Sequence, residues 1–70
     1  MNSSEKPIRN SHNMIIGICK EFPDRIIATH YRKGFVGCYV KGTDLTTDSS
    51  GKIYCYGDGT ADLIRSADNK

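Results

Sequence analysis

The side chains best suited to chemistry are three cysteines and a histidine spread along the middle of the chain: Cys19, His30, Cys38 and Cys55. Three thiolates and one imidazole are enough ligands for a zinc ion. Zinc modules usually draw their ligands in close pairs such as C-x₂-C, however, and every interval here is long. We therefore expect no metal site and no cofactor, and we interpret the cysteines as small apolar residues of a reducing compartment.

A cysteine nucleophile would need His30 within hydrogen-bond reach. Strand alternation places Cys38 on the opposite face from His30 and Cys19 on the same face, but no oxyanion site accompanies either pair. Ser50-Gly51-Lys52 resembles the end of a phosphate-binding loop. Ile53 stands where that loop requires Ser or Thr, and no helix follows. We therefore expect a protein that is not an enzyme and has no catalytic residues.

The elements that must position these residues are β-branched and aromatic runs separated by turn residues. The predicted strands are Met14–Phe22, Arg25–Arg32, Phe35–Lys41 and Lys52–Tyr56. Two-residue turns are predicted at Pro23-Asp24 and Lys33-Gly34, and a long polar loop over Thr43–Gly51. Asp58-Gly59 favours a hairpin into a fifth strand over Thr60–Ser66, and the alternative is a helix with Thr60 as its N-cap.

These elements predict one small, mainly β domain over residues 14–66, with four or five antiparallel strands. It would be a barrel or a sheet with a short helix, and it would be α+β if the C-terminal segment is helical. Residues 1–13 are polar and lack periodicity, so they predict a flexible N-terminal tail. Residues 67–70 predict a frayed C-terminus.

The predicted turns divide the central strands into two faces. One face collects the more apolar residues and is predicted to be the core: Ile16, Ile18, Phe22, Ile27, Thr29, Tyr31, Val36, Cys38 and Val40. The other face places His30 between Gly17 and Gly37 in one cross-strand row. Agreement among three independent segments on one apolar side favours an antiparallel meander.

The second face predicts a binding surface, which we call the basic-aromatic face. It consists of His30, Arg32, Phe35, Tyr39 and Lys41. Arginine and aromatic side chains with few neighbouring acids are typical of interface hot spots. The alternative is that a later strand or a C-terminal helix covers this face, in which case the glycines only make room for it.

Charge is distributed unevenly along the chain. The net charge is +2, with +4 over residues 1–42 and −2 over residues 43–70. We expect a small non-catalytic protein that binds another protein as an inhibitor, adaptor or regulator. The alternative is a small β-barrel that binds nucleic acid through the basic-aromatic face, helped by Tyr54 and Tyr56.

The N-terminal residues are polar and lead into no signal-peptide core. The longest apolar stretch, Met14–Cys19, is far too short to cross a membrane. These features predict a soluble, cytoplasmic protein with no membrane partner. Because a chain of 70 residues buries a limited core, a homo-oligomer is a further option.

Overall fold

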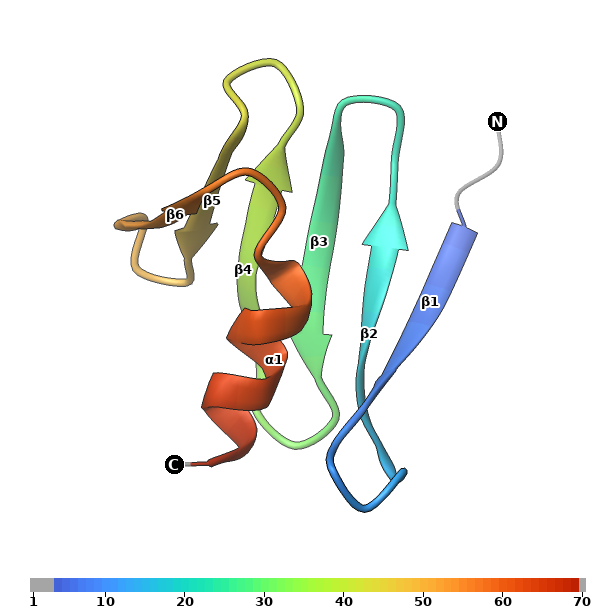
Figure 1. Ribbon diagram of the computed structural model, residues 1–70. Helices are drawn as coiled ribbons and strands as arrows, with labels where there is room; N and C mark the ends of the chain where they lie inside the picture. The colour runs from blue at the N-terminus through green and yellow to red at the C-terminus, as the bar shows by residue number, and fades with distance from the viewer. Residues whose placement is uncertain (1–3, 70) are drawn as a thin grey trace.

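The protein is an open antiparallel sheet with one helix, seen in a computed structural model that describes residues 4–69. The strands are β1 (Ser4–Arg9), β2 (Ile15–Glu21), β3 (Arg25–His30), β4 (Gly34–Val40), β5 (Leu45–Asp48) and β6 (Ile53–Tyr56). They lie side by side in chain order, and α1 (Thr60–Asp68) follows them. Figure 1 shows α1 crossing one face of the sheet in front of β3 and β4. None of the described helices is long and apolar enough to span a membrane.

The prediction of a single, mainly β domain is confirmed, with six strands instead of four or five. The predicted tail was wrong for Ser4–Arg9, which forms β1 and buries Ile8 against the core. Pro7 sits within β1 because an edge strand tolerates a residue that lacks an N–H donor. Residues 1–3 lie outside the described part of the chain.

The segment predicted as a polar loop contains a strand, β5. Within it, β5 pairs with β4, so that Leu45 lies opposite Val40 and Thr46 opposite Tyr39. β5 is short and half of its residues are threonine. Its stabilisation comes from the two neighbouring strands and not from a strong apolar pattern of its own.

The turns set the register between strands. The Pro23-Asp24 turn is confirmed, because the Phe22 amide donates to the Arg25 carbonyl at 2.7 Å. Gly17 therefore pairs with His30 as predicted. The next turn was wrong, since the three residues 31–33 connect His30 to Gly34, and Val36 is an extra residue in a bulge. As a result, Gly37 pairs with Ala28, two residues away from the predicted register.

The fifth predicted strand is the helix α1, so the hairpin interpretation of Asp58-Gly59 was wrong. The Asp58 carboxylate accepts hydrogen bonds from the Thr60 amide at 3.1 Å and from its hydroxyl at 2.6 Å. The Gly59 amide donates to the Thr46 hydroxyl at 2.9 Å, which ties the start of α1 to β5. The helix also extends to Asp68, past the predicted start of a frayed end.

The core lies between α1 and the face that contains Gly17, Cys19, Ala28 and Gly37. A Cβ atom on Gly17 would meet Ile64, and one on Gly37 would meet Leu63, so the glycines make room for the helix. We call this the helix-covered face, and its buried apolar residues are Ile8, Ile16, Cys19, Ala28, Leu63 and Ile64. The alternative of a covering C-terminal helix is thus what the structure contains.

The predicted core face was therefore assigned to the wrong side. Strand alternation puts most of its residues on the opposite side of the sheet, which we call the open face because no described element packs on it. Ile18 is 40% exposed there. Ile16 and Val36 are exceptions, because each is the extra residue of a bulge and packs on the helix side.

Candidate functional site

The structure does not assemble the basic-aromatic face as one surface. His30 is 1% exposed and lies beneath the C-terminal end of α1. Its Nε2 atom is 3.0 Å from an Asp68 carboxylate oxygen, and its Nδ1 atom accepts from the backbone amides of Arg32 and Lys33 at 3.1 and 3.3 Å. Both ring nitrogens are therefore occupied, and His30 joins the helix to the β3–β4 turn.

Arg32 and Phe35 lie at the same end of β4 but face different surroundings. The Arg32 guanidinium is 3.5 Å from the Asp68 carboxylate and stacks over the Tyr31 ring at 5.2 Å. Phe35 is half exposed and pairs with Thr29, which belongs to the open face. The charge of Arg32 is thus matched by an acid of α1.

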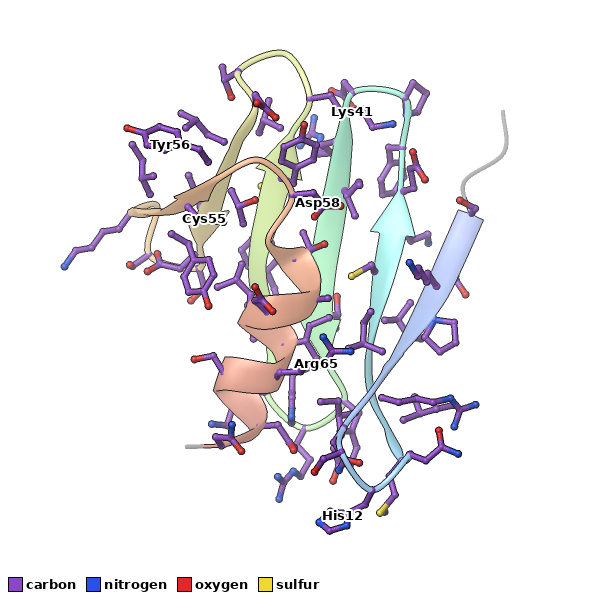
Figure 2. The ribbon with its side chains drawn as sticks, in the orientation of Figure 1. His12, Lys41, Cys55, Tyr56, Asp58 and Arg65 are labelled. Carbon is purple, nitrogen blue, oxygen red and sulfur yellow. The ribbon has the colours of Figure 1, made fainter. Side chains whose placement is uncertain are left out.

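Tyr39 and Lys41 lie at the opposite end of β4 from Arg32, and Figure 2 shows Lys41 at that end of the sheet. The Tyr39 hydroxyl donates to the Asp44 carboxylate at 2.7 Å, and this contact raises the pKa of the tyrosine. The Lys41 ammonium is 2.7 Å from the Glu21 carboxylate. The structure therefore brings Arg32 and His30 together at Asp68 and keeps Tyr39 and Lys41 apart from them.

The cysteines follow the predicted faces. Cys38 lies on the open face and Cys19 shares the helix-covered face with His30. All three cysteines are free thiols. Within residues 4–69, no three side chains of His, Cys, Asp or Glu are grouped so that they could hold a metal ion.

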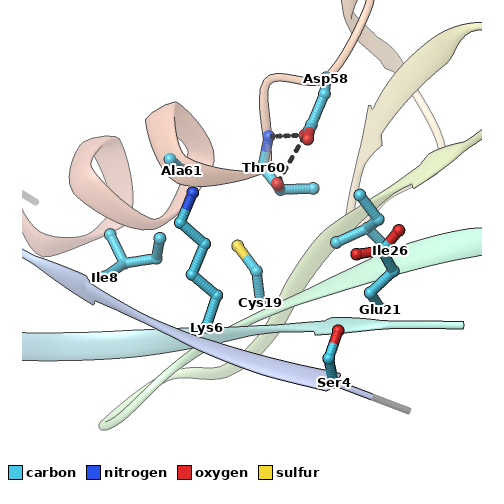
Figure 3. Close-up of a pocket in the computed structure, with 9 residues that line it drawn as sticks. All are labelled: Ser4, Lys6, Ile8, Cys19, Glu21, Ile26, Asp58, Thr60 and Ala61. Carbon is cyan, nitrogen blue, oxygen red and sulfur yellow. Dashed lines mark hydrogen bonds between the residues drawn. The ribbon is translucent and has the colours of Figure 1, made fainter. Parts of the chain in front are cut away.

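A small cavity lies beside Cys19, between the open end of the β1–β2 hairpin and the start of α1 (Figure 3). Its volume is about 190 Å³, which is below the usual range for ligand pockets. Lys6, Glu21 and Asp58 line it with both signs of charge. This combination of small volume and mixed charge does not favour it as a ligand site.

Cys19 should be the slowest of the three thiols to react. Burial raises the pKa of the Cys19 thiol, and a hydrogen bond with Thr60 acts in the opposite direction. Since the thiolate is the nucleophile, alkylation of native protein at neutral pH should modify Cys19 more slowly than Cys55. Mass spectrometry of timed iodoacetamide reactions gives the two rates. Equal rates in native protein would contradict this prediction, and in urea the rates should converge.

The open face carries a group of apolar side chains that extends from β2 to β6. Cross-strand pairing aligns Ile27 with Cys38 and Thr47, and aligns Val40 with Leu45 and Tyr56. Tyr56 is 81% exposed and Ile53 is 58% exposed. We define the open-face patch as the apolar members of these rows with their neighbours: Ile18, Ile27, Cys38, Val40, Leu45, Ile53 and Tyr56.

The charges beside the open-face patch are paired within the chain. Lys20 lies 3.8 Å from Glu5, and Arg25 lies 3.2 Å from Asp24. The Arg25 guanidinium lowers the pKa of the Asp24 carboxyl, so this acid stays ionised at neutral pH. The border of the patch therefore contains matched opposite charges and no strong field of one sign.

This patch was predicted to be core and not surface, because its side of the central strands carries more apolar residues than the other side does. The signal that could have corrected it is the small size of Gly17, Ala28 and Gly37 on the other side. Small residues in neighbouring strands leave room for an element to approach closely. That element is the only described helix.

Comparison with known proteins gives no match to this chain, whether with family models, with curated proteins or with solved structures.

Proposed function

We propose that this chain is a non-catalytic binding protein that acts through protein–protein contact, with the open-face patch as its contact surface. The observation that carries the proposal is a contiguous apolar row on a sheet face that no described element covers. Single exposed apolar residues are ordinary on protein surfaces, whereas a contiguous patch marks an interaction site.

The composition of the patch also favours a protein partner. Ile53 and Tyr56 supply large apolar contact areas at the exposed side of the patch. The charges around them are matched, which fits an apolar interface centre with a polar rim. The expected partner therefore presents a flat, apolar surface without a strong net charge. Such a contact suits an inhibitor, adaptor or regulator.

The nucleic-acid alternative has less support from the contacts of the basic-aromatic face. Phosphate contacts require cations that are available to the backbone of the ligand. Arg32 is paired with Asp68, and Lys41 with Glu21, so two cations of the basic-aromatic face already have carboxylate partners. The aromatic residues of that face are also separated along β4. We therefore favour the protein partner.

A photo-crosslinking experiment tests the proposal at matched positions. Benzoylphenylalanine is placed at Tyr56 in the open-face patch, or at Tyr31, an exposed tyrosine in the β3–β4 turn. After irradiation in a lysate of the source organism, the Tyr56 probe should cross-link one protein identifiable by mass spectrometry, and the Tyr31 probe should not.

Two further conditions make the outcome decisive. Adding Ile53→Glu to the Tyr56 probe should remove the cross-link, because it places a charge in the patch. Nuclease treatment should leave the cross-link unchanged. A cross-link that persists in the Ile53→Glu variant, that nuclease removes, or that is absent from both probes would overturn the proposal.

A further inference from the structure

We infer that the open-face patch is occupied by a second copy of this chain, so that two sheets pack face to face as a two-fold dimer. The inference rests on the proposed function, because both require this patch to be an interface. It adds the identity of the occupant. Four features of the described chain support it: burial, area, charge and the state of the sheet edges.

Burial is one-sided in the single chain. Among the described residues, six apolar side chains are buried between α1 and the sheet, whereas Ile18, Ile53 and Tyr56 of the open-face patch are 40–81% exposed. Short chains bury a small fraction of their surface and often gain the remaining stability from association. A second sheet on the open face would give this chain the two-sided burial that layered β domains have.

The area of the face matches what a stable dimer needs. The molecule is a slab of 33 × 28 × 17 Å, so each of its broad faces spans at most about 900 Å². Specific interfaces typically bury about 800 Å² on each partner. Two open faces packed over most of their area would therefore approach the standard size without any rearrangement of the chain.

Charge also permits self-association. A two-fold contact places each patch against its own copy, so a patch with a strong net charge would repel itself. Here Lys20 is matched by Glu5, and Arg25 is matched by Asp24. The charges at the border of the patch therefore cancel within each ion pair. Two copies can meet there without bringing together an excess of positive or negative charge.

The sheet edges favour stacking of faces over extension of the sheet. The outer strand β1 contains Pro7, which lacks an N–H donor. The other outer strand, β6, has a bulge where its pairing shifts between Thr46 and Thr47 of β5. Prolines and bulges both blunt the pairing of edge strands. The face is therefore the surface through which two copies associate, and a two-fold contact closes without forming a fibre.

Sedimentation velocity over a range from nanomolar to high micromolar concentration tests the inference. The wild-type chain should sediment at twice the chain mass in the upper part of this range. The double variant Ile53→Glu/Tyr56→Glu should weaken the dimer by roughly tenfold or more, because charges enter the patch. Both residues are more than half exposed, so the variant should keep its circular dichroism spectrum.

The matched control is Met14→Glu/Tyr31→Glu. Both of its positions are 61% exposed, and both lie in turns outside the open-face patch. This control should dimerise like the wild type. A second readout is the thiol of Cys38, which lies in the patch, while Cys55 pairs with Thr46 on the helix-covered face. Alkylation of Cys38 should slow as concentration rises, and that of Cys55 should not.

The outcomes separate the two proposals. A wild-type chain that is monomeric at every concentration, or a control that dissociates as much as the patch variant, would overturn the dimer. If the monomeric chain still cross-links another protein from Tyr56, the proposed function stands with a different partner. If it cross-links nothing, both proposals fail.

Discussion

Replacing Gly17 by alanine is expected to lower the free energy of unfolding by about 3 kcal/mol. A Cβ atom at this position would collide with the Thr29 carbonyl oxygen and would come within 2.7 Å of Cγ2 of Ile64. Relieving the first contact disturbs the pairing of β2 with β3, and relieving the second displaces α1. A chain of this length is stabilised by only about 4–10 kcal/mol in total, so the loss would be a large share.

The matched control for this substitution is Gly42→Ala. A Cβ atom there meets nothing within 4 Å, and the backbone of Gly42 is not in the left-handed region. This variant should change the unfolding free energy by less than about 0.5 kcal/mol. Urea unfolding followed by circular dichroism measures both values. Equal changes in unfolding free energy for the two substitutions would mean that α1 does not pack against Gly17.

Replacing Ile64 by alanine should cost about 3 kcal/mol. Ile64 is fully buried, and it packs with Ile8, Ile16 and Ala28 on the helix-covered face. The substitution removes apolar contacts and leaves a cavity beneath the centre of α1. Because the helix has nine residues, it depends on these contacts more than on its own propensity.

The same change at Ile15 provides the comparison. Ile15 is 49% exposed at the start of β2, so Ile15→Ala should cost under about 1 kcal/mol. Thermal and urea unfolding of the two variants at one low concentration give the difference. If Ile15→Ala were the more destabilising change, the core would not lie under α1.

The register of β2 with β3 could be predicted because the chemistry of the turn between them fixes it. Pro23-Asp24 forms a two-residue turn, so Gly17 pairs with His30. Cys38 still lies on the opposite face from His30, because the bulge at Val36 offsets the extra residue of the β3–β4 turn and the register shifts by an even number of residues. Which face is covered was not predictable from apolar content. That choice depends on where α1 docks, and α1 docks on the side whose side chains are smallest.

Two strands escaped prediction because their stabilisation comes from distant residues. In β1, only Ile8 is buried, and its strand neighbour is Gly17 in β2. In β5, Thr46 is fully buried. Its hydroxyl tolerates burial because it donates to the Gly57 carbonyl and accepts from the Gly59 amide. Single-chain patterns count a threonine as polar and do not register such partners.

The candidate site was predicted only in part. The sequence located an aromatic and basic group around β4, in a stretch of chain that contains no acidic residue. In the folded protein, however, acidic residues from distant segments lie beside its cations. Asp68 reaches Arg32 and His30 from 36 and 38 residues away, and Glu21 reaches Lys41 across the sheet. The open-face patch, in contrast, consists largely of residues whose apolar pattern is evident in the sequence and was interpreted as core.

The position of α1 after all six strands has a consequence for synthesis on the ribosome. Each hairpin of the meander can pair as soon as its second strand emerges, because neighbours in the sheet are neighbours in the chain. Leu63 and Ile64, which cover the core, emerge only after β6. Until then, the nascent sheet has two bare apolar faces, and such intermediates are prone to aggregation. The nascent chain therefore has most need of chaperone protection in the interval between the emergence of β6 and the docking of α1.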